Sequence, residues 1–277
     1  MPELIDSLKN IKLAIFDLDG VVYRGKKLIP MVDNVIETLK KHSIKVVYNS
    51  NNSTMTRAIY VEKLKSLNIP SDINDFYTSA SIASAEITKL KENAKIFVIG
   101  EFGLREELQL KGHKVVTDPI IRDIDFVIVG LDRDFTYEKL SVAQKCILEG
   151  KAQFYATNAD ATLPDDDGFK PGAGTMVTAL ITCTGQDPTR IFGKPEPFGI
   201  QLILEDFRIP PEQACIIGDR LNTDILAGNR AGIMSIVVLT GVTTREMIEM
   251  VKKDSKSDRN LIPDLVVENL NGIFKIT

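Results

Sequence analysis

The chain has 277 residues, of which 44% are hydrophobic and 26% charged, and its formal net charge at pH 7 is −4. This length suits one large or two ordinary globular domains, each with a real core. The slightly acidic balance, with both charge signs mixed along the chain, argues against nucleic acid or an anionic membrane as the main partner. No apolar run approaches the roughly 20 residues of a membrane span, and residues 1–6 lack the features of a signal peptide. We therefore expect a soluble cytoplasmic protein.

Three cysteines, Cys146, Cys183 and Cys215, lie in apolar segments and show no metal-ligand spacing. Buried free thiols in a reducing compartment are expected in preference to disulfides.

Short apolar runs alternate with segments of helical periodicity along the whole chain. Strands are expected at residues 13–17, 45–48, 96–100, 115–116, 126–129, 154–156, 214–217, 235–239 and 265–267. Helices are expected at residues 32–42, 57–67, 101–110, 137–148, 176–183, 198–207, 223–231 and 245–252. This alternation is typical of the α/β class, in which parallel sheets carry helices on both faces.

Two carboxylates, Asp17 and Asp19, follow the first expected strand. Open α/β sheets bind their ligands outside the carboxyl ends of their strands. Two carboxylates about 4 Å apart would repel each other by roughly 4 kcal/mol at an effective dielectric constant near 20. A cation is therefore expected beside them, and the pair predicts a metal site.

Polar groups also collect after three other expected strands or loops. They are Ser50-Asn51-Asn52-Ser53, Gly193-Lys194-Pro195, and Gly218-Asp219-Arg220 followed by Asp224. Taken alone, each is more typical of a turn, a loop or a helix cap than of a catalytic site, and Ser53 or Thr54 is a candidate cap for the helix that follows. Parallel strands bring all these groups to one sheet edge, and that convergence favours a functional site.

Phosphoryl transfer is the chemistry that such a set supports. Asp17 can attack phosphorus to form an aspartyl-phosphate, and Asp19 can exchange protons with the leaving oxygen and the attacking water. Mg²⁺ requires only two or three protein oxygens. Ser50 and nearby amides can hold phosphoryl oxygens, Lys194 can neutralise charge, and Gly20 lets the chain turn sharply toward the phosphate.

These motifs, in this order and spacing, resemble the haloacid dehalogenase superfamily. The similarity is greatest to its p-nitrophenylphosphatase branch, which includes phosphoglycolate and pyridoxal phosphatases. It covers nearly the whole chain and extends to residues 157–164 and to Pro171-Gly172-Ala173-Gly174. Ser50 stands where many relatives have threonine, which keeps the hydroxyl, and Ala159 stands where relatives often carry proline.

The resemblance implies a role for each matching residue. Asp17 would be the nucleophile and a Mg²⁺ ligand, and Asp19 the acid/base and a ligand through its backbone carbonyl. Lys194 would hold Asp17 and the phosphate, Asp219 would complete the metal site, and Asp224 would bond a metal-bound water or a neighbouring ligand. The residues expected to bind the phosphate ester are Gly20, Ser50, Asn51, Asn52, Lys194 and Asn158.

The family fold implies a doubly wound, Rossmann-like core of residues 1–81 and 187–277, with an inserted α/β cap of residues 82–186 over the catalytic pocket. The candidate specificity residues on the cap are Asn158, Asp160 and a turn at residues 162–164, although a plain polar loop is an equal alternative. Cap-mediated dimers occur in this branch, so a homodimer is possible.

Other motif readings fail. Asp17–Gly20 opens no EF-hand, because the sixth and twelfth positions are Val22 and Leu28. The sequence around Lys194 lacks the upstream glycine and the hydroxyl residue of a P-loop, and residues 172–174 lack the third glycine of a dinucleotide fingerprint. His42 and His113 are expected on the surface.

Three hypotheses remain: a phosphatase, another reaction of the superfamily, and a non-catalytic protein with the same fold. A dehalogenase would not need Asp19, and a phosphonate hydrolase would need a Schiff-base lysine from its cap. A non-catalytic binding or regulatory protein should have lost the nucleophile or a metal ligand. The intact set of acids favours a Mg²⁺-dependent phosphatase acting on small-molecule phosphate monoesters.

Overall fold

The computed structural model describes residues 2–165 and 168–275, and the chain forms two compact units. The first unit comprises Met1–Ser50, Val61–Tyr77 and Lys194–Thr277, and the second comprises Asn51–Tyr60 and Thr78–Gly193. Residues 51–60, 78–81 and 187–193 thus belong to the second unit, whereas the sequence prediction assigned them to the core. The outer ends of the predicted core, residues 1 and 277, lie outside the described residues.

The first unit is built on a six-stranded sheet with the order β15-β14-β13-β1-β4-β5. The strands are β1 (Leu13–Phe16), β4 (Lys45–Ser50), β5 (Phe76–Thr78), β13 (Ala214–Gly218), β14 (Met234–Val238) and β15 (Leu265–Val267). β1 pairs in parallel with both β4 and β13. The chain builds outward from β1 through β4 first, and returns later to add β13 on the other side. The carboxyl ends of β1 and β13 therefore flank the point where the strand order reverses, which is the usual ligand position in such sheets.

Helices lie on both faces of this sheet. They are α1 (Val32–Lys41), α7 (Phe198–Phe207), α8 (Leu226–Ala231) and α9 (Arg245–Lys253). Ile203 of α7 and Ala227 of α8 pack with Ile15 in one apolar cluster. Leu39 of α1 lies with Ala14 on the opposite face, because successive residues of a strand point to opposite sides. The fold is thus wound on both sides of the sheet.

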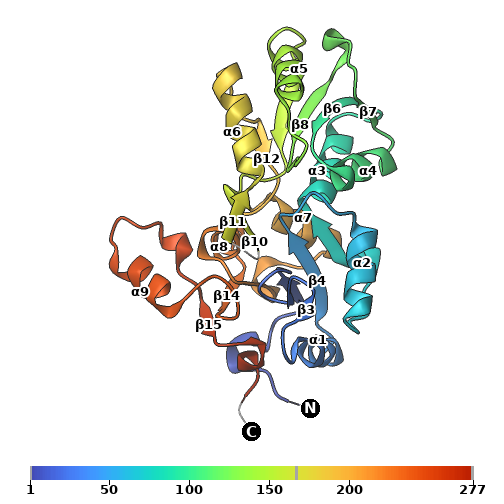
Figure 1. The fold of residues 1–277 in the computed structure, drawn as a ribbon. Coiled ribbons are helices and arrows are strands. Elements are labelled where there is room, and N and C mark those ends of the chain that lie inside the picture. Colours follow the sequence, from blue (N-terminus) through green and yellow to red (C-terminus); the bar gives the residue numbers. More distant parts are fainter. Residues whose placement is uncertain (1, 166–167, 276–277) are drawn as a thin grey trace. The chain divides into compact units, whose positions relative to one another are not determined.

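The second unit carries its own parallel sheet, with the order β12-β9-β8-β6-β7 (Figure 1). Its strands are β6 (Lys95–Ile99), β7 (Lys114–Val116), β8 (Phe126–Val129), β9 (Gln153–Ala156) and β12 (Arg190–Ile191). Its helices are α3 (Ser79–Leu90), α4 (Phe102–Leu110), α5 (Tyr137–Leu148) and α6 (Ala173–Thr184). Helix α2 (Arg57–Ser66) begins in this unit and ends in the first.

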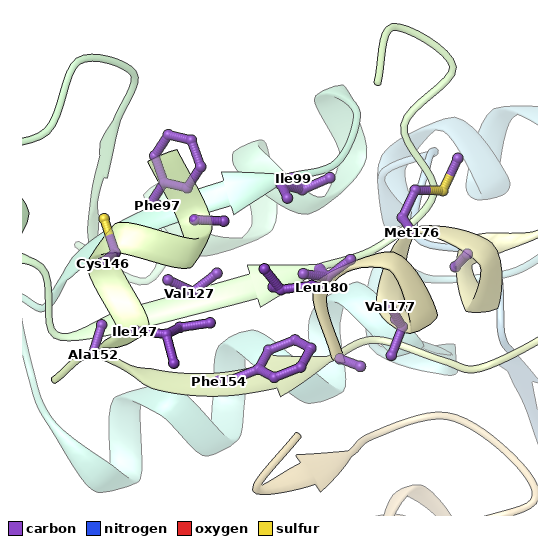
Figure 2. Packing of buried hydrophobic residues seen from close by; sticks show 14 of the residues in the cluster. Phe97, Ile99, Val127, Cys146, Ile147, Ala152, Phe154, Met176, Val177 and Leu180 are labelled. Atoms are coloured by element: carbon purple, nitrogen blue, oxygen red, sulfur yellow. The ribbon is translucent and has the colours of Figure 1, made fainter. Parts of the chain in front are cut away.

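Helices α5 and α6 bury their apolar side chains against one face of the second sheet. Figure 2 shows Ile147 of α5 and Leu180 of α6 pointing toward Val127 and Phe154 of the strands. Leu180 and Val127 are fully buried. This cluster gives the second unit a hydrophobic core of its own, as expected for an inserted domain.

The predicted fold class, a parallel-sheet α/β core with an inserted α/β domain, is confirmed. The prediction missed helix α3, whose Ser- and Ala-rich sequence has weak apolar periodicity, although Thr78 and Ser81 form a capping box at its start. It also missed two hairpins, β2–β3 (Tyr23–Arg24 and Lys27–Leu28) and β10–β11 (Thr162–Asp165 and Gly168–Pro171). The predicted turn at residues 162–164 was wrong, because these residues belong to β10.

Three smaller predictions need correction. His113 is buried, and its imidazole bonds the Ala94 amide and the Thr88 hydroxyl. Thr56, in place of Ser53 or Thr54, caps α2 by accepting the Ile59 N–H at 3.3 Å. The three cysteines are free as expected, but Cys183 is only half-buried.

Burial gives the thiols of the other two cysteines little tendency to ionise. It raises the pKa of the Cys146 thiol to about 11 and that of the Cys215 thiol to about 12. Among the described residues, no helix has both the length and the apolar character needed to cross a membrane.

The substitution Leu180→Ala should lower the free energy of unfolding of the second unit by about 2–5 kcal/mol, because it opens a cavity in the cluster of Figure 2. Leu110→Ala makes the same chemical change at the exposed end of α4, and it should alter stability by no more than about 0.5 kcal/mol. Urea denaturation of both variants measures the difference. Equal losses would contradict the assignment of Leu180 to a close-packed core.

Acid should destabilise the protein through His113. Its Nδ1 accepts the Ala94 N–H at 3.2 Å, so the proton of the neutral ring lies on Nε2, 2.9 Å from Thr88 Oγ1. Burial lowers the pKa of His113 from its ordinary value of 6.5. The unfolded chain therefore binds this proton more readily, so the stability is complete above pH 6.5 and falls as the pH drops through that value.

Melting temperatures between about pH 7.5 and about pH 5.5, the range in which histidine titrates, test this effect. His113→Gln should show a shallower loss on acidification than the wild type. His42→Gln, at a half-exposed site, should follow the wild type. Identical slopes for His113→Gln and the wild type would exclude His113 as the source.

Candidate active site

The buried ammonium of Lys194 is the centre of a polar cluster in the first unit. Its Nζ donates to Asp17 Oδ1 at 2.7 Å, to the Asn49 backbone carbonyl at 2.9 Å and to Asp224 Oδ1 at 2.5 Å. The Lys194 side chain is only 4% exposed, and that of Asp224 only 1%. Three segments far apart in the sequence are thus joined by one cation.

The sheet brings the acids of this cluster together. Asp17 directly follows β1 and continues its pairing, since its N–H donates to the Ile217 carbonyl of β13 at 2.9 Å. Asp219 follows β13, and Asp224 lies in the π-helical turn Leu221–Ile225 that comes next. The Asp224 carboxylate also accepts the N–H of Arg220, the residue before this turn, at 3.1 Å. This hydrogen bond stabilises the start of the turn.

A fourth segment, which the sequence analysis missed, holds Asp219. The Val242 N–H donates to Asp219 Oδ2 at 2.8 Å, and the Thr243 N–H donates to the Asp219 carbonyl at 3.0 Å. Gly241 must lack a side chain, because a Cβ there would overlap the Asp219 carboxylate. The signal available in the sequence was a glycine just after β14, at the same sheet edge.

The charges of this cluster are unbalanced. One ligand oxygen from each of Asp17, Asp219 and Asp224 can lie within 4.8 Å of the others, and Lys194 is the ammonium that contacts two of them. Burial, followed by the charge of Asp224, raises the pKa of Asp219 to about 6. Burial also raises the pKa of Asp17, and Lys194 offsets this only in part.

Lys194 itself stays protonated. Burial alone would lower the pKa of its ammonium, but the carboxylates of Asp17 and Asp224 reverse the effect and raise it. Three carboxylates against one ammonium leave two negative charges uncompensated. Hard oxygen donors with this excess charge fit a divalent cation such as Mg²⁺. The cluster is therefore able to hold a metal ion.

Asp19 and Gly20 form the turn beside this cluster. Gly20 has φ +83° and a Cβ would meet the Asp219 carboxylate, so only glycine fits. Its N–H donates to the Tyr23 carbonyl at 2.8 Å, and its carbonyl accepts the Thr240 hydroxyl at 2.7 Å. The Asp19 side chain reaches solvent, although desolvation by its buried neighbours raises the pKa of its carboxyl.

Ser50, a predicted phosphate ligand, is the last residue of β4 and is buried in the first unit. It directly follows Asn49, whose carbonyl accepts from Lys194. The sheet thus brings Ser50 to the same edge as Asp17.

The other predicted phosphate ligands, Asn51, Asn52 and Asn158, lie in the second unit. Asn51 Nδ2 donates to both carboxylate oxygens of Asp160, at 3.0 and 3.2 Å, and the Asn158 amide donates to the Asn51 carbonyl at 2.8 Å. Asn52 Oδ1 accepts from the amide and the hydroxyl of Thr54. Asn158 and Asp160, predicted as specificity residues, therefore both bond Asn51.

Comparison with known proteins identifies the family. Residues 14–114 match the family model described as haloacid dehalogenase-like hydrolase, and residues 191–273 match a second, HAD-hydrolase-like model. The chain belongs to the haloacid dehalogenase-like hydrolases. The resemblance inferred from the motifs is thus confirmed.

Relatives of this hydrolase span nearly all of its length. It is 36% identical to an acid sugar phosphatase of Staphylococcus haemolyticus, over 90% of this chain and 92% of the relative. It is 32% identical to phosphoglycolate phosphatase 2 of Arabidopsis thaliana, over 99% of this chain and 98% of the relative. The crystal structure of a 4-nitrophenylphosphatase from Thermotoga maritima superposes with a TM-score of 0.85 at 35% identity, covering 95% of this chain and 96% of the other. The prediction of a phosphoric monoester hydrolase of the haloacid dehalogenase family is therefore confirmed.

Asp219→Asn should have two opposite effects on stability. A pKa of about 6 in place of 3.8 means that the ionised carboxylate costs the metal-free fold up to about 3 kcal/mol at neutral pH. The metal-free variant should therefore be at least as stable as the wild type, while any stabilisation by added Mg²⁺ should fall sharply because a candidate ligand is removed. Thermal melts with EDTA and with Mg²⁺ measure both effects.

Asp118→Asn, at an exposed position of the second unit, is the matched control and should behave as the wild type in both conditions. A full Mg²⁺ shift in Asp219→Asn would exclude Asp219 as a metal ligand.

Proposed function

We propose that this hydrolase cleaves small-molecule phosphate monoesters in a Mg²⁺-dependent reaction, through an aspartyl-phosphate on Asp17. The observation that supports this most directly is the contact of the buried Lys194 ammonium with Asp17, beside Asp219 and Asp224. The arrangement fixes one oxygen of Asp17 and leaves the other for attack on phosphorus.

In the first half-reaction, the free oxygen of Asp17 attacks phosphorus and the bond from phosphorus to the ester oxygen breaks. Asp19 donates its proton to the departing oxygen. Desolvation favours this role because it raises the pKa of the Asp19 carboxyl, so that more of the acid form is present. The products of this step are the free alcohol and phosphorylated Asp17.

In the second half-reaction, water attacks the phosphorus of the aspartyl-phosphate, and Asp19 takes the proton of that water. The bond from Asp17 to phosphorus breaks, which returns the carboxylate and releases inorganic phosphate. Lys194 faces Asp17 throughout and offsets negative charge at this position. Asp17, Asp219, Asp224 and the backbone carbonyl of Asp19 would hold Mg²⁺, and the ion would supply positive charge against the phosphoryl oxygens.

Ser50, the amides of Asn51 and Asn52, and Gly20 are proposed to hold the phosphoryl group, with Asn158 supporting Asn51. We also propose that the second unit is the cap of the family fold. The free thiols support a reducing, cytoplasmic location. That the protein has no nucleic acid or membrane partner remains a prediction, and so does the homodimer. Sedimentation analysis would test the homodimer.

Asp17→Asn should reduce phosphate release at least about a thousandfold, because an amide cannot serve as the nucleophile. The assay uses a panel of phosphomonoesters that includes p-nitrophenyl phosphate, with Mg²⁺ and with EDTA. EDTA should abolish release by the wild type. Asp118→Asn is again the control and should keep full activity.

Asp19→Asn separates the acid from the nucleophile. p-Nitrophenolate leaves without protonation, so this variant should lose more activity on alkyl phosphates than on p-nitrophenyl phosphate.

Release by Asp17→Asn at the wild-type rate would exclude the mechanism. No release by the folded, Mg²⁺-loaded wild type would favour the alternative, a non-catalytic binding or regulatory protein.

A further inference from the structure

The segment of residues 240–243, which comes after β14, contacts the turn that carries Asp19. The Thr240 hydroxyl donates to the Gly20 carbonyl at 2.7 Å, although these two residues are 220 positions apart in the sequence. The Arg24 guanidinium, from the hairpin that follows the turn, donates to the Thr240 carbonyl. Thr240 is therefore joined to this part of the chain by two hydrogen bonds, one from its side chain and one to its backbone.

The same segment also holds Asp219. The Val242 N–H donates to Asp219 Oδ2 at 2.8 Å. A Cβ at Gly20 or at Gly241 would overlap this same oxygen, so both glycines lie directly against it. The turn and the segment thus meet at one carboxylate of the metal cluster, and all of these residues belong to the first unit.

Two hydrogen bonds of Gly20 fix the orientation of the turn. Its N–H donates to the Tyr23 carbonyl at 2.8 Å, and its carbonyl accepts the Thr240 hydroxyl. A glycine with φ +83° has few steric limits on its backbone, so these hydrogen bonds supply the constraint. The Gly20 N–H and the Asp19 carbonyl belong to one planar peptide group, so fixing Gly20 also fixes the direction of that carbonyl.

We propose that Thr240 is a positioning residue for Asp19, because its hydroxyl holds the turn of Asp19 in place relative to Asp219. The acid/base and the metal ligand then keep the same geometry in both half-reactions. This inference rests on the phosphatase mechanism proposed above, which gives the Asp19 carboxyl its role at the leaving oxygen. Proton transfer requires hydrogen-bond distance, and a misplacement of about 1 Å can cost about 100-fold in rate.

Thr240→Val removes the hydroxyl and keeps the branched shape of the side chain. It should lower kcat/KM for ethyl phosphate about tenfold more than kcat/KM for p-nitrophenyl phosphate, because only the alkyl leaving group needs the proton of Asp19. Thr240→Ser keeps the donor and should retain the wild-type ratio between the two esters. Assays of phosphate release at saturating Mg²⁺ measure this ratio.

Thr244→Val is the matched control. It makes the same replacement four residues away, where the Thr244 hydroxyl accepts the Met247 N–H at the start of α9. Loss of this cap should lower the melting temperature and leave the ester ratio unchanged. A purely structural role of Thr240 would make the two variants alike. An unchanged ratio in Thr240→Val, or equal losses on both esters, would therefore overturn the proposal.

The affinity for Mg²⁺ separates this inference from the phosphatase activity. The Asp19 carbonyl is a proposed metal ligand, and Thr240→Val releases the turn that orients it. Calorimetric titration with Mg²⁺ should therefore give a dissociation constant about tenfold higher for Thr240→Val than for the wild type, Thr240→Ser or Thr244→Val.

A wild type that releases no phosphate would contradict the proposed mechanism, and the dissociation constants would then decide whether Thr240 positions the turn. A higher value in Thr240→Val alone would support that role. Equal values, or no Mg²⁺ binding by any of the four proteins, would reject it.

Discussion

The contact of one lysine with two aspartates organises the candidate active site of this hydrolase. Lys194 is 4% exposed, and its ammonium spans the ends of β1 and β4 and the turn after β13. Buried ion pairs seldom add stability, because desolvation of both partners offsets their attraction. This contact and the third buried carboxylate beside it therefore lower the free energy of unfolding. They also give the site the charge that it needs to bind a cation and a phosphoryl group.

The sheet explains why so few residues suffice to build this site. β1 and β13 are neighbours, and the strand order reverses between them. Asp17 and Asp219 therefore lie at the carboxyl ends of these strands, where the strand order reverses. No long loop is needed to place them there. The strand pairings fix the backbone on both sides, which limits the positions that the two carboxylates can take. Rigid placement of this kind is what catalysis by positioning and charge requires.

The sequence predicted the acids at this edge well, because Asp17 and Asp219 come directly after apolar runs and their charge has no structural reason. It could not predict the Val242 amide on Asp219, since residues 240–243 carry no charge and their backbone direction depends on β14. The contact of Asn51 with Asp160 joins positions 109 apart, and no local pattern encodes it. The burial of His113 was likewise invisible, because a turn residue becomes a core residue only when α3 packs over it.

Each unit of the chain carries one deeply buried thiol. Cys215 lies on β13 in the first unit, and Cys146 lies on α5 in the second. Burial raises the pKa of both thiols, so little of the reactive thiolate forms in the folded protein. Alkylation must wait until the surrounding segment opens. The rate at which a maleimide modifies each cysteine therefore reports how often its own unit opens, so the chain contains two separate reporters of local unfolding.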